Sequence, residues 1–173
     1  MNKNLKKGQK AEKKIQKTLK GSRRTIGSGN CMNDADLKFD NILIESKAYD
    51  DENITFYKKF WDKLKKQAIR YNKIPCYVYT NNTDSYCIML SSDLYTLNDK
   101  FLLYTLNSLN SEDYKENEKT FVINKSYINT LDNLLKEKQK QKTKAEIGIK
   151  FEWNKEEFIV LELYQLNRIV NKK

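Results

Sequence analysis

Asp36, Glu45 and Lys47 lie close together in the sequence and combine two carboxylates with one ammonium group. Carboxylate oxygens are the ligands that Mg²⁺ prefers, and a bound divalent cation can activate water and neutralise charge on phosphorus oxygens. An ammonium group beside them can orient the attacking water or help to deprotonate it. These residue types therefore predict metal-dependent phosphodiester chemistry.

The 173-residue chain contains no histidine, and this absence narrows the chemistry further. Histidine is the usual general base and the commonest transition-metal ligand. Ser-His-Asp triads, Cys-His pairs and histidine-dependent nuclease sites are therefore excluded. Carboxylates that hold a hard cation remain, so we expect Mg²⁺ as the cofactor, with Mn²⁺ able to replace it.

The strands that would position the two carboxylates form a predicted hairpin. Residues 34–39 alternate charged and apolar side chains, residues 42–48 form the second strand, and Asp40-Asn41 suits a two-residue turn. With that turn the numbers of paired residues sum to 81, so Asp36 stands opposite Glu45. Directly opposed Cβ atoms are about 4.5–5.5 Å apart, where like charges repel. A magnesium ion about 2.0–2.1 Å from the oxygens would turn this repulsion into coordination.

Lys47 lies two residues beyond Glu45 and therefore on the same face of the strand. The backbone carbonyl of Ser46, between them, is a further candidate metal ligand. Glu-x-Lys alone is weak evidence, because Glu12-Lys13-Lys14 also matches it. Two alternatives remain open: a register shift of one residue would place Asp34 at the site, and a surface hairpin would leave these charges in solvent.

The elements around the hairpin indicate a mixed α/β domain with helices packed on a central sheet. Apolar residues at four-residue intervals predict a helix over residues 9–20, and similar patterns predict helices over 55–72 and 92–109. Residues 76–80 and 86–90 are predicted strands. Residues 110–119 are polar and are expected to form a loop or linker. Beyond them we expect strands at 121–124, 147–153 and 158–163, with helices at 127–139 and 164–170.

The domain organisation that follows is a core over residues 1–109 and a C-terminal α/β extension over residues 110–173, which could pack on the core as one domain. Residues 1–30 carry ten Lys or Arg against one acidic residue, Glu12, within a chain of net charge +10. This excess predicts binding to a polyanion, most simply nucleic-acid phosphate, although a solvated lysine-rich terminus is the alternative.

The location is expected to be the cytoplasm. No stretch approaches the roughly 20 apolar residues needed to cross a bilayer, and the start lacks the apolar segment of a secretory signal. Three cysteines, Cys31, Cys76 and Cys87, fit reduced thiols better than a disulfide framework. We expect no membrane partner.

At these residues the sequence resembles the PD-(D/E)XK nuclease superfamily, and within it the archaeal-type and phage-encoded Holliday junction resolvases. The resemblance covers about residues 5–95, and its ordered set of motifs is more specific than any one of them. The segments that carry it are Lys7-Gly8-Gln9-Lys10-Ala11-Glu12, Arg24-Thr25-Ile26-Gly27-Ser28-Gly29, Asp34-Ala35-Asp36-Leu37, Ile44-Glu45-Ser46-Lys47 and Lys66-Gln67-Ala68. Ala35 departs from the usual proline, and the residues after Leu109 have no counterpart in the minimal resolvases.

The resemblance implies a restriction-endonuclease-like αβββαβ core and assigns further residues to the site. Glu12 would be an additional acidic site residue, Ser28 a contact to phosphate or to metal-bound water, and Gln67 a supporting polar group. Glu12 could instead be a charge on the helix surface, and Gln67 an ordinary helix residue. The basic residues expected to grip DNA phosphates are Lys7, Lys10, Lys14, Arg23 and Arg24.

The function that the resemblance implies is a magnesium-dependent DNA endonuclease. Branched DNA, such as a four-way Holliday junction, is the expected substrate in recombination and repair. Two symmetric nicks in a junction imply a homodimer with two sites. The alternatives are a restriction-like or repair nuclease of the same superfamily, because a fold does not determine a substrate, and a nucleic-acid-binding protein with an inactive site.

Overall fold

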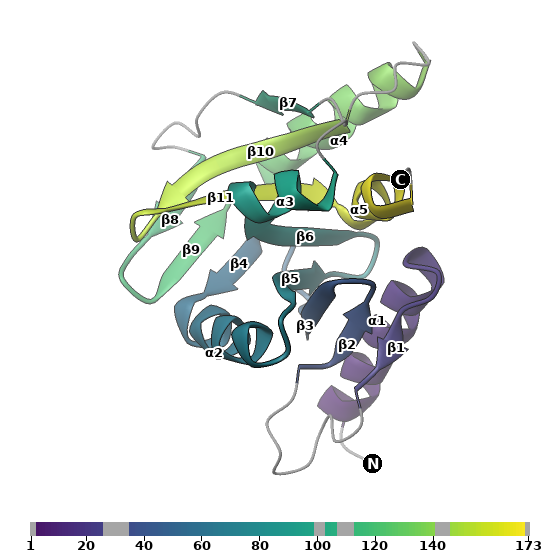
Figure 1. Cartoon of the computed structure of the whole chain (residues 1–173). Helices are drawn as coiled ribbons and strands as arrows, with labels where there is room; N and C mark the ends of the chain where they lie inside the picture. The colour runs from purple at the N-terminus through teal and green to yellow at the C-terminus, as the bar shows by residue number, and fades with distance from the viewer. Residues whose placement is uncertain (1–2, 26–34, 99–102, 107–112, 141–145, 172–173) are drawn as a thin grey trace.

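The computed structural model describes residues 3–25, 35–98, 103–106, 113–140 and 146–171 (Figure 1). The first half of the chain forms α1 (Lys3–Thr18), β1 (Arg23–Arg24), β2 (Leu37–Phe39), β3 (Ile42–Ala48), β4 (Ile54–Tyr57), α2 (Lys58–Arg70), β5 (Ile74–Thr80), β6 (Ser85–Leu90) and α3 (Ser91–Leu97). The second half forms β7 (Leu103–Leu106), β8 (Tyr114–Glu116), β9 (Thr120–Ile123), α4 (Lys125–Lys140), β10 (Glu146–Trp153), β11 (Glu156–Glu162) and α5 (Leu163–Asn171).

A central mixed sheet has the strand order β1-β2-β3-β5-β6-β11-β10-β7. The pairs β3/β5 and β10/β7 are parallel, and the other neighbours are antiparallel. A second, antiparallel sheet contains β4, β9 and β8. The expected fold class, a mixed central sheet flanked by helices, is confirmed. The order α1, β1, β2, β3, α2, β5 matches the expected αβββαβ core, and β4 is an insertion that joins the second sheet.

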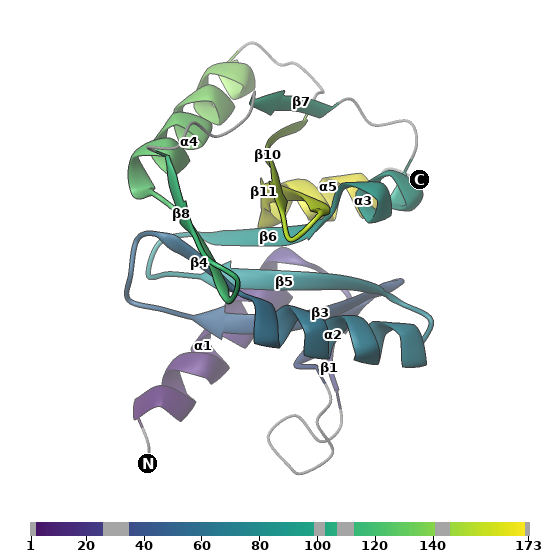
Figure 2. The same cartoon turned by 90° about the vertical axis from the view of Figure 1, so that its left-hand side faces the viewer.

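The central sheet has a buried core on each face. One core contains side chains from α1, α3 and α5, such as Ile15, Leu94 and Leu166. The other contains side chains from α2, α4 and the small sheet. Figure 2 shows α2 in front of β3 and β5, with α1 behind them. Alternation along β3 decides the faces, since Leu43 belongs to the α2 side whereas Ile42 and Ile44 belong to the α1 side.

Three sequence-based element predictions need correction. Residues 55–57 belong to β4 rather than to a helix, because Ile54 and Phe56 alternate inward and the strand pairs with β9. The helix predicted over 92–109 ends at Leu97, and β7 follows within that range. The polar segment 110–119 includes β8, whose main chain pairs with β9 although its side chains are mostly exposed. In each case main-chain pairing outweighed the local pattern.

The C-terminal residues extend the same sheet as the N-terminal ones. β11 pairs with β6, and β9 pairs with β4. Phe56 from β4 packs edge to face on Phe158 from β11, with ring centroids 5.2 Å apart, and on Trp61 from α2 at 5.6 Å. Aromatic pairs of this kind add to the free energy of burial. The proposed boundary near residue 109 lies outside the described residues and stays a prediction.

Candidate active site

The hairpin that carries the acidic pair has the expected register. Leu37 pairs with Ile44, and Phe39 pairs with Ile42. Asp40 adopts a φ of 49°, the left-handed conformation that a tight two-residue turn requires. Asp36 directly precedes Leu37, and Glu45 directly follows Ile44, so the same register places Asp36 opposite Glu45. The alternative register, with Asp34 in this position, is excluded.

Asp36 is half-buried and is held by the neighbouring strand. The backbone N–H of Ser46 donates a hydrogen bond to Asp36 Oδ2 at 2.8 Å. Burial, followed by the charge of Glu45, raises the pKa of Asp36 to about 6, although the Ser46 N–H and the Lys47 ammonium act to lower it. The raised pKa therefore reflects mainly burial, with repulsion by the opposed acid as the second cause.

Glu45 is 5% exposed and points to the α2 side of the sheet, as does Leu43 two residues before it. Lys47 Nζ donates a hydrogen bond to Glu45 Oε1. The same ammonium group lies 4.4 Å from the centroid of the Phe60 ring in α2. These two contacts hold Lys47 beside both carboxylates, in agreement with the predicted face.

Glu12 reaches the edge of this region from α1. Its Oε2 forms an ion pair with Arg24 Nε in β1 at 2.8 Å. Burial raises the pKa of Glu12, and Arg24 lowers it. The charge of Glu12 also raises the pKa of Asp36, so the two groups interact electrostatically. Because Arg24 pairs with Leu37 across β1 and β2, the sheet carries Arg24 to this position.

The candidate ligand set is small. Within the described ranges, no group of three or more His, Cys, Asp or Glu side chains could hold a metal ion. Glu12 pairs with Arg24 instead of joining Asp36 and Glu45 in one cluster. A metal site here therefore depends on the two opposed carboxylates and on main-chain oxygen.

Gln67 and Ser28 were the two supporting residues suggested by sequence. Gln67 is buried on α2, the helix that packs over the face bearing Glu45, and its Oε1 has no hydrogen-bond partner in the described part of the chain. A buried amide oxygen without a partner is costly and is commonly matched by water or an ion. Ser28 lies outside the described residues.

Two tyrosines that the sequence reasoning missed lie beside the acidic pair. Tyr77 in β5 is the register partner of Glu45, and its hydroxyl is 3.5 Å from that of Tyr49. Burial raises the pKa of both tyrosines, and the charge of Glu45 adds to it. Their hydroxyl groups therefore stay protonated and add no charge to this side of the site. Parallel pairing of β3 with β5 through a helical crossover brings Tyr77 there, and no local sequence signal indicates that pairing.

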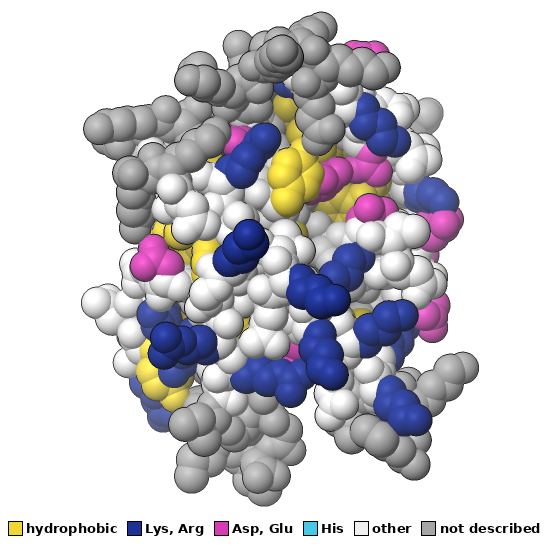
Figure 3. Space-filling view, turned by 90° about the vertical axis from the view of Figure 1, so that its right-hand side faces the viewer, with side chains coloured by type: hydrophobic (Ala, Val, Ile, Leu, Met, Phe, Trp, Pro, Cys, Tyr) yellow, Lys and Arg dark blue, Asp and Glu magenta, His cyan; other side chains and the backbone are white. Residues whose placement is uncertain are grey.

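The basic residues expected to contact DNA lie on two elements. Lys7, Lys10 and Lys14 line a pocket beside α1, whereas Arg23 and Arg24 are exposed on the edge strand β1. Figure 3 shows Lys and Arg side chains gathered over the lower half of the face that bears α1, with few acidic ones between them. No helix in the described ranges is long and apolar enough to cross a membrane.

The fold is similar to Hjc, a Holliday junction resolvase from the archaeal hyperthermophile Archaeoglobus fulgidus, with 13% sequence identity and a TM-score of 0.41 over 69% of this chain and 85% of that chain. No protein-family model and no curated protein matches the sequence.

Proposed function

We propose that this protein is a magnesium-dependent DNA endonuclease that hydrolyses a phosphodiester bond at the site formed by Asp36, Glu45 and Lys47. The observation that carries the proposal is the opposition of the two carboxylates across the hairpin, with an ammonium group held beside them. Two opposed acids, one buried and one half-buried, repel each other, and within the described residues the Lys47 ammonium group hydrogen-bonds only to Glu45, so a further cation would be stabilised between them.

The donor set fits a hard cation. Asp36 and Glu45 supply carboxylate oxygens, which suit Mg²⁺ and Mn²⁺. The Ser46 N–H points to Asp36, and the C=O of a strand residue points to the same edge as its N–H. The hydrogen-bonded pairing of β2 with β3 ends at Leu37 and Ile44. The Ser46 carbonyl lies beyond this last pair, so we propose it as a third oxygen ligand. When bound, the cation would supply charge neutralisation and an activated water.

Lys47 supplies the remaining chemistry. Glu45 and the Phe60 ring restrict its ammonium group, so little conformational freedom remains to be lost when substrate binds. From this position Nζ can hold the attacking water or a non-bridging phosphate oxygen by a charged hydrogen bond. Gln67, with its unpartnered Oε1, is proposed as a supporting acceptor for such a water.

DNA is the proposed substrate because of charge. Ten basic side chains lie within residues 1–30, and Arg24 of β1 pairs with Glu12, whose charge acts on Asp36. Contacts from lysine and arginine to phosphate supply affinity without reading base sequence. Branched DNA, cut by a homodimer with two equivalent sites, is the preferred substrate form.

The test is cleavage of a labelled synthetic four-way junction by purified protein in Mg²⁺ and in Mn²⁺. We expect nicking by the parent protein, and a loss of about 10²–10⁴-fold in Lys47→Ala. Asp36→Asn should lose at least as much, although its amide oxygen can still accept from the Ser46 N–H. Lys38→Ala is the matched control, because Lys38 also lies over a ring, that of Tyr71 at 4.5 Å. It should keep most of the activity.

The outcomes separate the candidate activities. Equal nicking by the parent, Asp36→Asn and Lys47→Ala would overturn the proposed site. Preference for a supercoiled plasmid over the junction would favour a restriction-like or repair nuclease. Salt-sensitive DNA binding that is unaffected by Lys47→Ala, without metal-dependent cleavage, would leave a nucleic-acid-binding protein.

A further inference from the structure

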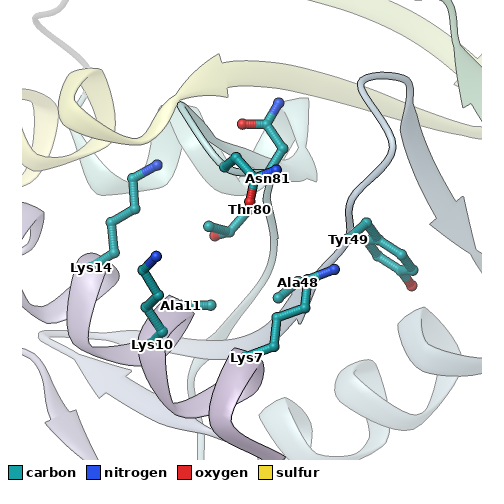
Figure 4. A pocket seen from close by; sticks show the side chains of 9 residues that line it. Lys7, Lys10, Ala11, Lys14, Ala48, Tyr49, Thr80 and Asn81 are labelled. Carbon is teal, nitrogen blue, oxygen red and sulfur yellow. The ribbon is translucent and has the colours of Figure 1, made fainter. Parts of the chain in front are cut away.

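A small pocket lies between α1 and the ends of β3 and β5. Figure 4 shows Lys7, Lys10 and Lys14 projecting from α1, with Thr80 and Asn81 across from the helix and Lys7 extending toward Ala48 and Tyr49. The three lysines follow the spacing i, i+3 and i+7, which places them on one side of the helix. Glu12 lies on a different side of the helix, where it pairs with Arg24. The pocket therefore lies on a different side of α1 from Glu12, and neither Asp36 nor Glu45 lines it.

Positive charge is concentrated in this pocket. Lys14 Nζ donates to the Thr83 carbonyl oxygen at 2.6 Å, and Lys7 Nζ contacts Asp50 Oδ1 at 2.7 Å. Lys10 has no hydrogen-bond or ion-pair partner in the described part of the chain. Burial lowers the pKa of Lys14, and although Asp84 raises it, the nearby charge of Lys10 lowers it again. Ammonium groups close enough to repel in this way favour an anion between them.

The neutral residues of the pocket also suit an anion. Asn81 Oδ1 accepts hydrogen bonds from the backbone N–H groups of Thr83 at 3.0 Å and Asp84 at 2.6 Å. Its Nδ2 group therefore remains as a donor at the pocket. The small side chain of Ala11 leaves room between the lysines. Ammonium and amide donors around a small hollow match the oxygens of a phosphate group.

We propose that this pocket binds one phosphate group of a polynucleotide backbone, on the strand that the acidic pair cleaves. The location on that strand rests on the proposed function, whereas phosphate binding does not. Ala48, which lines the pocket, is three residues beyond Glu45 in β3, a separation of about 10 Å at roughly 3.3 Å per residue. That length places the pocket within a few nucleotides of the acidic pair along one strand, since a duplex strand rises roughly 3.4 Å per nucleotide along its axis.

The test compares two lysines of the same helix. Lys10 lines the pocket, whereas Lys13 is also exposed on α1 but does not line it. We expect Lys10→Ala to weaken binding of a fluorescent four-way junction about fivefold to tenfold in 0.1 M salt. The slope of log affinity against log salt concentration should fall by about one phosphate contact. Lys13→Ala should change affinity much less. Measurement in EDTA excludes cleavage, so failure of the nuclease proposal leaves this test intact.

A second arm identifies the phosphate and its source. Affinities of the parent and of Lys10→Ala are measured for a series of junctions. In each junction one phosphate is replaced by a neutral methylphosphonate. The proposal predicts one position at which the neutral group weakens binding of the parent but not of the variant. Equal losses in Lys10→Ala and Lys13→Ala, or no such position, would overturn it. A thermal shift in 10 mM inorganic phosphate that Lys10→Ala abolishes, without any change in DNA affinity, would assign the pocket to a free anion and likewise overturn it.

Discussion

Two pairs of neighbouring acidic side chains differ in their surroundings, one within the central sheet and one between this sheet and α4. Asp36 and Glu45 face each other across the β2/β3 hairpin. Asp132 from α4 meets Glu162 at the end of β11. Burial is the main cause of a raised pKa in both pairs, to about 6 for Asp36 and to about 8 for Glu162. A raised pKa alone therefore does not distinguish them.

The hydrogen-bond donors around each pair make the distinction. The carboxyl groups of Asp132 and Glu162 hydrogen-bond to each other, which requires a proton between them, and the Tyr86 hydroxyl lies 3.2 Å from Asp132 Oδ1. Asp36 accepts instead from the Ser46 N–H, and Glu45 accepts from Lys47. A shared proton relieves repulsion in one pair, whereas the other pair accepts hydrogen bonds from an ammonium group and a main-chain N–H, and it is the pair that we propose binds a cation.

The largest expected contrast is in cleavage. Glu45→Gln removes one ligand from the proposed site and with it several kcal/mol of charge stabilisation, so nicking of junction DNA in Mg²⁺ should fall about 10³-fold. Glu162→Gln should cleave at nearly the parental rate, because an amide can donate to Asp132 as the protonated acid does. Rates from single-turnover gels test the contrast. Equal losses in both variants would remove the proposed difference between the pairs.

A second contrast is metal-linked stability. A ligand that binds only the folded state stabilises it, and a concentration near 10 Kd contributes about 1.4 kcal/mol. For a chain of this size the Mg²⁺-dependent rise in melting temperature should be about 4 °C. Asp36→Asn should abolish the rise, and Asp132→Asn should keep it. If Asp132→Asn alone abolished the rise, the cation would belong to the other pair.

The third contrast is the pH dependence of stability without metal, and its sign follows from the raised pKa of Glu162. The folded state holds this proton more tightly than the unfolded state, so the stabilisation is full below the ordinary pKa of 4.5 and is lost as the pH rises through about 8. The contribution of Asp36 ends near pH 6. Denaturant unfolding between pH 6.5 and 9 therefore reports on Glu162.

Glu162→Gln should flatten that decline, because its amide keeps the neutral form at every pH. Glu157→Gln on the same strand is the control with the same change in charge, since Glu157 is paired with Lys150 and its pKa is lowered. This variant should keep the parental slope. A flat parental profile between pH 6.5 and 9 would contradict the shared proton of the second pair.

The hairpin and the first helix were accessible to sequence reasoning because their signals are local. A two-residue turn sets the register of its strands, so the sequence alone places Asp36 opposite Glu45. The stripe of Ala11, Ile15 and Leu19 located the buried side of α1. Alternation along β3 put Lys47 on the face of Glu45. The second acidic pair gave no such signal, because Asp132 and Glu162 lie far apart in the chain.

The corrected elements show where local patterns fail. Residues 55–57 carry the apolar spacing of a helix start, but pairing with β9 makes them a strand. The predicted helix over residues 92–109 ends at Leu97, and β7 then pairs with β10. Both outcomes depend on a partner strand more than 40 residues away along the chain. Propensity is a weak guide where long-range pairing is available.

By itself, the sequence determined the absence of histidine chemistry, the basic first helix and the register that opposes two acids, because composition and short-range geometry need no knowledge of distant contacts. The tertiary structure alone decided what surrounds those acids. Parallel pairing of β3 with β5 sets Tyr77 beside Glu45, and packing of α1 against the strand ends creates the lysine pocket. The physical reason is that burial and charge depend on neighbours in space, which a long crossover brings together.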